Sequence, residues 1–126
     1  MRVLKLVGLA FGAMFLTAMV MGSFEGIAHA IYPGLDPAHD DIPTAAILLV
    51  LAGNFAGASA GGWVVGRFAG ASAMSLSVIL GVLFTFGQAI NLATIPHPWW
   101  FTVLGLCAFL PPYVGVARAV AARRAS

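Results

Sequence analysis

Long apolar segments separated by short polar links dominate the pattern of the chain. Four such segments cover roughly residues 3–29, 44–65, 72–92 and 99–120. Because an α-helix rises about 1.5 Å per residue, each segment is long enough to cross a hydrocarbon core of about 30 Å. Pro and Gly residues in the links end each helix. The pattern predicts an all-α membrane protein in which residues 1–126 form one domain, a bundle of four antiparallel transmembrane helices.

The composition supports a location in lipid. Hydrophobic residues make up 61% of the 126 residues and charged residues only 8%, against about 25% in an ordinary soluble domain. The mean hydropathy is +1.00. The few basic residues form no patch interleaved with aromatic side chains, so a nucleic-acid partner is excluded and the lipid bilayer is the expected one. The single cysteine, Cys107, excludes an intrachain disulfide and is expected to be inert packing.

The basic residues predict the orientation of the bundle. They lie before the first segment, in the second link and at the end of the chain, namely Arg2, Lys5, Arg67, Arg118, Arg123 and Arg124. The first and third links contain no Lys or Arg. Because Lys and Arg are retained on the cytoplasmic side, both termini are expected in the cytoplasm.

The first segment imitates a cleavable signal peptide. Arg2 and Lys5 precede an apolar stretch, and Ala28-His29-Ala30 has the form of a cleavage site. The apolar stretch over residues 6–22 is longer than the usual hydrophobic region of a signal peptide. We therefore expect the segment to be retained as the first membrane helix.

Glycine spacing predicts which helix lies at the centre. The second segment contains two rows spaced by four, Gly53-Gly57-Gly61 and Gly62-Gly66-Gly70. Such GxxxG rows let helix backbones approach closely in lipid. The first segment repeats the spacing at Gly8/Gly12 and Gly22/Gly26, which predicts tight packing between the first two helices. Two faces on one helix serve either two neighbours within the bundle or one neighbour and a second subunit.

Two adjacent prolines interrupt the fourth segment. Pro111 and Pro112 deny hydrogen-bond partners to the carbonyls of Cys107 and Ala108, so a kink is expected there. Membrane helices tolerate such a bend when neighbours or water satisfy the freed groups. The kink is therefore either structural or part of a cavity lining.

Five polar residues are expected to converge in one layer near the outer surface, namely Glu25, His29, Gln88, Asn91 and His97. Three interpretations stay open. Ionisable groups at membrane depth often mark a proton, ion or ligand site. Glu25, His29 and His97 are also the candidate ligands for a metal or a haem. Alternatively, Glu25 pairs with His29 across one helical turn, and both side chains extend to water.

Asn54 lies deeper than these five. Ten residues from the start of the second segment place it about 15 Å below the surface, near the bilayer midplane. We expect its side chain to take part in helix packing through an interhelical hydrogen bond, which is usually worth about 1 kcal/mol.

The chain resembles a family of small, uncharacterised bacterial four-helix membrane proteins. The resemblance rests on residues 25–33 (EGIAHAIYP), the glycine-rich region 57–62, and residues 91–98 (NLATIPHP). It implies four helices, an association of the first and third links, and a multi-pass protein of the bacterial inner membrane. It implies no activity or ligand.

Three functions remain as hypotheses. The chain contains no nucleophile beside a base, no phosphate-binding loop and no carboxylate pair, so it offers no catalytic residue and identifies no cofactor. The leading hypothesis is a non-catalytic structural or accessory subunit that packs through its glycine faces as a homo-oligomer or in a larger membrane complex. The alternative is a small oligomeric carrier, or a metal- or cofactor-binding protein, that uses the polar layer. A haem or quinone held between His29 and His97 is the third.

Overall fold

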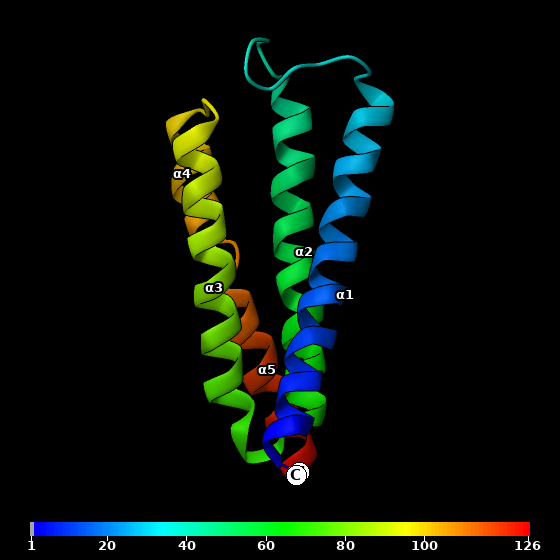
Figure 1. Cartoon of the computed structure of the whole chain (residues 1–126), viewed down its shortest axis with the longest axis vertical. Helices are drawn as coiled ribbons and strands as arrows, with labels where there is room; N and C mark the ends of the chain where they lie inside the picture. The colour runs from blue at the N-terminus through cyan, green and yellow to red at the C-terminus, as the bar shows by residue number, and fades with distance from the viewer. Residues whose placement is uncertain (1) are drawn as a thin grey trace.

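The computed structural model describes residues 2–126, and this part of the chain contains helices and no strand. The helices are α1 (Arg2–Ile31), α2 (Thr44–Phe68), the short η1 (Gly70–Ser72), α3 (Ala73–Thr94), α4 (Trp99–Leu106) and α5 (Leu110–Ala125) (Figure 1). Four stretches are long and apolar enough to cross a membrane: Arg2–Ile31, Thr44–Phe68, Gly70–Thr94 and Trp99–Ala125. The prediction of an all-α chain with four segments long and apolar enough to cross a membrane is confirmed for the described residues. The first three helices extend two or three residues beyond their predicted ends.

The bundle has two distinct ends. The start of α1 and the C-terminus lie together at the bottom of Figure 1, and we call this the terminal end. The links 32–43 and 95–98 lie at the opposite end, the loop end. Pro43 and Pro98 stand directly before α2 and α4 with φ angles of −57° and −60°. A missing N–H has no consequence in the first turn of a helix, so both prolines mark helix starts at the loop end.

Helix α2 lies at the centre because its glycines admit two neighbours. A Cβ added at Gly53 or Gly57 would lie 2.6 Å from Phe24 Cβ or 2.8 Å from the Thr17 carbonyl oxygen, both on α1. A Cβ at Gly62 would lie 2.7 Å from the Tyr113 carbonyl oxygen, and one at Gly66 would lie 2.6 Å from the Ala117 carbonyl oxygen, both on α5. The two glycine faces of α2 thus pack against two helices of the same chain.

The glycines of α1 do not take part in this packing. A Cβ added at Gly8, Gly12, Gly22 or Gly26 would meet nothing within 4 Å. The predicted tight packing of α1 against α2 is confirmed, but the expectation that the glycines of α1 provide it is wrong. The contact is one-sided: α1 inserts larger side chains, such as Thr17 and Met21, against the glycines of α2. One glycine-lined helix is enough to bring two backbones close together.

The fourth apolar segment is broken rather than kinked. Helix α4 ends at Leu106, residues 107–109 are non-helical, and α5 begins at Leu110 with Pro111 and Pro112 in its first turn. The prolines start a new helix, where they need no N–H, instead of bending an existing one. The carbonyls of Cys107 and Ala108 accept none of the described backbone hydrogen bonds between elements. Cys107 is exposed, so the expectation that it is packing is wrong.

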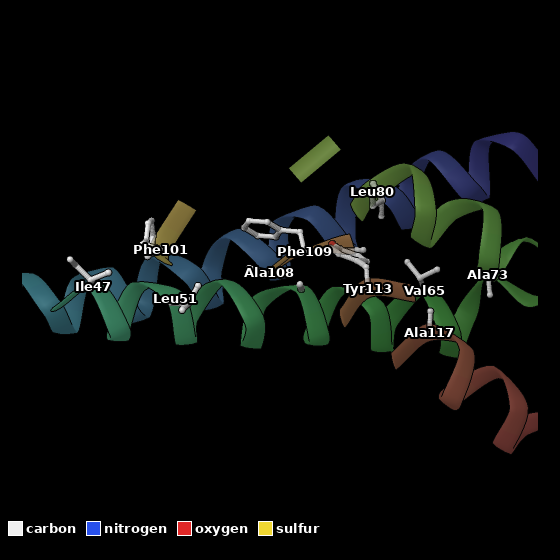
Figure 2. Close-up of a cluster of buried hydrophobic side chains, with 12 residues drawn as sticks. Ile47, Leu51, Val65, Ala73, Leu80, Phe101, Ala108, Phe109, Tyr113 and Ala117 are labelled. Carbon is white, nitrogen blue, oxygen red and sulfur yellow. The ribbon is translucent and has the colours of Figure 1, made fainter. Parts of the chain in front are cut away.

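The core is densest in the half toward the terminal end. Figure 2 shows Phe109, Tyr113 and Val65 gathered there, while Ile47 and Phe101 stand apart toward the loop end. The Phe84 ring stacks on Phe109 and on Tyr113, with centroids 5.4 and 6.0 Å apart. Across the bundle, the Tyr113 hydroxyl lies 2.6 Å from Thr17 Oγ1, which donates to the Ala13 carbonyl oxygen. The Tyr113 hydroxyl is therefore the donor to Thr17, and it ties α5 to α1.

Candidate functional site

A cavity of about 500 Å³ lies toward the loop end, between helices α1 to α4. Its wall is mainly apolar, with Met21, Ile47, Val50, Phe84, Phe101 and Phe109 among the lining residues. This volume is typical of small-molecule sites, which combine an apolar wall with a few polar groups. The dense core of the opposite half does not continue here, and the space between the helices is open.

All five residues of the predicted polar layer line this cavity. Glu25 and His29 come from α1, Gln88 and Asn91 from α3, and His97 from the link before α4. Gln88 is buried, and Gly105 of α4 makes room for it: a Cβ at Gly105 would lie 2.9 Å from Gln88 Nε2. The depth of each polar residue in the bundle follows from its distance along the helix from the loop end. Gln88 is six residues from the end of α3, or about 9 Å deep by helix rise.

The side chains of this layer are largely free of partners within the chain. None of the described hydrogen bonds uses the side chain of Glu25, His29, Gln88 or Asn91. The expected pairing of Glu25 with His29 is absent, since the ion pair found in residues 2–126 joins His39 to Asp36. The free polar groups leave hydrogen-bonding capacity for another molecule.

His97 is the one member of the layer with a fixed orientation. Its Nδ1 lies 2.6 Å from the Ile95 carbonyl oxygen, and its ring stacks on Phe101 with centroids 4.8 Å apart. A carbonyl only accepts hydrogen bonds, so Nδ1 carries the hydrogen and the neutral ring keeps its lone pair on Nε2. His97 can therefore accept a hydrogen bond while neutral and donate one when protonated.

Asn54 also lines the cavity, at a deeper level. The residue is 2% exposed, and its Nδ2 has no hydrogen-bond partner. The predicted interhelical hydrogen bond is therefore not formed. Gly53 and Gly57, its neighbours on α2, pack against α1, whereas Asn54 lines the cavity. A buried, unpaired amide is unfavourable by about 1–3 kcal/mol, so this group is a marked exception in the interior.

The break in the fourth segment adjoins the same cavity. Phe109, the last non-helical residue, is among the lining residues. Non-helical backbone at membrane depth occurs where it is buried in protein or lines a cavity. Of the two interpretations of Pro111 and Pro112, a purely structural bend or part of a cavity lining, the structure supports the second: the helix breaks beside the cavity wall.

The arrangement of the ionisable residues gives the metal-site interpretation no support. No group of three or more His, Cys, Asp or Glu side chains able to hold a metal ion occurs among residues 2–126. Glu25, His29 and His97 line one cavity but do not converge on one point. The polar side chains that line the cavity can instead form hydrogen bonds with a bound molecule.

A smaller hollow of about 380 Å³ lies where the two links at the loop end meet. Its lining includes His39, Asp40 and Asp41 from one link, and Pro96 and His97 from the other. Asp36 organises the first link: its carboxylate accepts from the Ala38 N–H at 3.0 Å and lies 2.7 Å from His39 Nδ1. The hydrogen bond from the Ala38 N–H, and to a smaller extent the contact with His39, hold the pKa of Asp36 below its ordinary value of 3.8.

The aromatic lining was not predicted from the sequence. Phe84, Phe101 and Phe109 sit in apolar segments rich in Phe, Leu and Val, and nothing in their spacing separates a cavity wall from a lipid-facing surface. The one available signal was the interruption of the fourth segment by Pro111 and Pro112, two residues after Phe109. Broken helices in membrane proteins often mark a binding site.

Comparisons with known proteins suggest no function, so the functional argument rests on the geometry of the cavity. No family model, curated protein or solved structure matches the chain.

Proposed function

We propose that this protein binds a small molecule in the cavity at the loop end and acts as a carrier or receptor for it in the membrane. One observation carries the proposal: polar side chains from α1 and α3 line a cavity of about 500 Å³ without partners of their own, and His97 from the link before α4 adds a ring held by the Ile95 carbonyl. Groups at membrane depth lose their contact with bulk water, so free polar side chains there favour a bound ligand.

The proposed orientation follows from charge. The six Lys and Arg residues lie at the start of α1, in the last turn of α2 and toward the C-terminus, whereas the loop end contains none. Basic residues stay on the cytoplasmic side. We therefore place the termini in the cytoplasm, the helices antiparallel and the cavity in the periplasmic half of a bacterial inner membrane.

An accessory subunit is the second candidate. The sequence suggested this function because α2 has two glycine faces, but in the structure both faces are covered, one by α1 and the other by α5. The exposed glycines of α1, including Gly8 and Gly12, offer a different face to a second copy or a partner. Gly8→Leu combined with Gly12→Leu would convert an oligomer to a monomer in native mass spectrometry if this face associates. An unchanged mass distribution would count against it.

The ligand-binding proposal is tested with a matched pair of variants. Gly87 lines the cavity and has open space at its Cβ position, so Gly87→Phe places a ring in the cavity without a backbone clash. Gly12→Phe adds the same ring on the exposed face of α1. Protein purified from native membranes is extracted with solvent, and small molecules are quantified by mass spectrometry.

The proposal predicts a stoichiometric molecule in the wild type and in Gly12→Phe that is lost in Gly87→Phe. Equal recovery of every extracted compound from the two variants, with no stoichiometric species in the wild type, would refute ligand binding in this cavity.

A further inference from the structure

One face of α1 forms a wall of the cavity, and an acidic residue lies in the middle of that face. The lining residues from α1 are Met21, Glu25, Ala28, His29 and Tyr32. Because successive residues of a helix are turned by about 100°, these five fall within a stripe about 100° wide, with Glu25 near its centre. Glu25 is exposed in the bundle and Ala28 beside it is buried. The Glu25 side chain therefore projects from the face of α1 that lines the cavity.

Glu25 has no counter-charge in this cavity. The ion pair described in residues 2–126 joins His39 to Asp36, and the lining residues include no Lys or Arg. His29 and His97 are the basic side chains of the lining, and neither carries the permanent positive charge of Lys or Arg. An unpaired carboxylate at membrane depth is unfavourable. A ligand that carries positive charge supplies the missing partner.

The charge distribution of the whole chain acts in the same direction. All four acidic side chains lie toward the loop end, namely Glu25, Asp36, Asp40 and Asp41, whereas all six Lys and Arg residues lie toward the terminal end. A cleft that is lined by one sign of charge and has walls of low dielectric constant concentrates ions of the opposite sign. The loop end therefore attracts cations and repels anions.

The remaining wall favours an apolar body on that cation. Met21, Val50 and Phe84 line the cavity and are partly exposed, so their apolar surfaces are available to a ligand. Tyr32, on the same stripe as Glu25, adds an aromatic ring, and aromatic rings attract cations to their faces. A metal ion would leave the apolar wall uncovered, and the described residues contain no group of three ligands able to hold one. The lining therefore fits an organic cation.

We infer that the cavity takes a lipophilic organic cation, whose charge lies beside Glu25 and whose apolar body contacts Met21, Val50 and Phe84. The inference rests on the proposed function and adds the chemical class of the ligand. The positive charge belongs to an amine, a quaternary ammonium or a similar group, and either a soluble molecule or the headgroup of an amine-containing lipid carries such a group.

The test uses two probes of nearly equal size and opposite charge, tetraphenylphosphonium and tetraphenylborate. Binding to purified protein is measured by equilibrium dialysis with the same detergent on both sides, and each probe is compared between variants so that its uptake by detergent cancels. Glu25→Gln removes the charge and keeps the shape, and Glu25→Asp keeps the charge. Asp41→Asn is the control, because it removes one negative charge from the loop end at a residue outside the lining of this cavity.

We expect Glu25→Gln to weaken phosphonium binding about tenfold, which equals about 1.4 kcal/mol. Two opposite unit charges about 6 Å apart attract with that energy at an effective dielectric constant of about 40, between the values for a protein surface and for water. Glu25→Asp and Asp41→Asn should bind the phosphonium within about twofold of wild type. Glu25→Gln should not weaken binding of the borate. Gly87→Phe should abolish phosphonium binding, while Gly12→Phe retains it.

Four results would overturn the inferred cation. The first is equal phosphonium affinity in wild type and Glu25→Gln, and the second is an equal loss in Glu25→Gln and Asp41→Asn, which would assign the effect to net charge. The third is phosphonium binding that survives Gly87→Phe, which places the probe outside the cavity. The fourth is a lack of phosphonium binding to wild type.

The native extract separates failure of this inference from failure of the proposed function. A stoichiometric compound that is lost in Gly87→Phe supports the proposed function whatever its charge. If that compound contains an amine or quaternary nitrogen, it supports the cation as well, and its mass and headgroup distinguish a soluble molecule from a lipid. An anionic compound refutes the cation alone, whereas an extract without a Gly87-sensitive compound refutes both.

Discussion

A single methyl group at Gly61 should test the packing that joins three helices. Gly61 lies on α2 where the Tyr113 hydroxyl of α5 meets Thr17 of α1, and a Cβ there would overlap both Tyr113 Oη and Thr17 Oγ1. Tyr113 cannot easily withdraw, because it is fully buried, its ring stacks on Phe84 and its carbonyl abuts Gly62. The Gly61→Ala substitution must therefore displace packed side chains or separate the backbones.

The magnitude follows from three terms. Overpacking of a core by one methyl costs about 1–3 kcal/mol, and loss of the Thr17–Tyr113 hydrogen bond adds about 1 kcal/mol. Replacing glycine by alanine within a helix returns about 1 kcal/mol. We expect Gly61→Ala to lower the free energy of unfolding by about 2 kcal/mol. The control, Gly12→Ala, adds the same methyl in open space and should be neutral or stabilising by up to about 1 kcal/mol.

The assay is unfolding by sodium dodecyl sulfate in mixed micelles, followed by tryptophan fluorescence. The double variant Gly61→Ala, Tyr113→Phe removes the hydroxyl that the methyl would strike, so its destabilisation should be smaller than the sum of the two single changes. If Gly61→Ala and Gly12→Ala agreed within about 0.5 kcal/mol, a difference no larger than ordinary surface substitutions give, the packing at Gly61 would be refuted.

Three further predictions concern the cavity and the loop end. In the absence of ligand, Asn54→Leu should raise the free energy of unfolding by about 1–3 kcal/mol, because it removes an unpaired buried amide; destabilisation in the same detergent assay would contradict this. Replacing Pro111 and Pro112 together by Ala restores two N–H donors opposite the carbonyls of Cys107 and Ala108 and should join α4 to α5, seen as slower amide exchange over residues 107–112; unchanged exchange would show that the break has another cause. Because the pKa of Asp36 is lowered on folding, its contacts stabilise the first link above pH 3.8 and are lost as the pH falls through the lowered pKa. The protection of amides over residues 32–43, measured as exchange relative to the intrinsic rate at each pH, should therefore fall in acid. Asp36→Asn should remove that pH dependence, and a profile identical to wild type would argue against the contacts.

The sequence determined the elements that depend on local composition. Apolar length alone predicted the four membrane-crossing segments, because a helix must satisfy its own backbone in lipid. Pro43 and Pro98 stand directly before α2 and α4 for a similarly local reason, since a missing N–H is harmless in a first turn. Depth along each helix also predicted that Glu25, His29, Gln88, Asn91 and His97 lie at similar levels, and the structure places them around one cavity.

The tertiary structure decided what depends on the rotation of each helix and on its neighbours. GxxxG spacing is the same on α1 and α2, yet only the glycines of α2 meet another backbone, because the spacing does not say which face is turned inward. Asn54 was placed at the correct depth, but its missing partner depends on the separation of α2 from α3 and α4 toward the loop end. The cavity is a property of that separation: the stack of Phe84, Phe109 and Tyr113 closes its inner end, and the stack of His97 on Phe101 at the loop end does not fill the space.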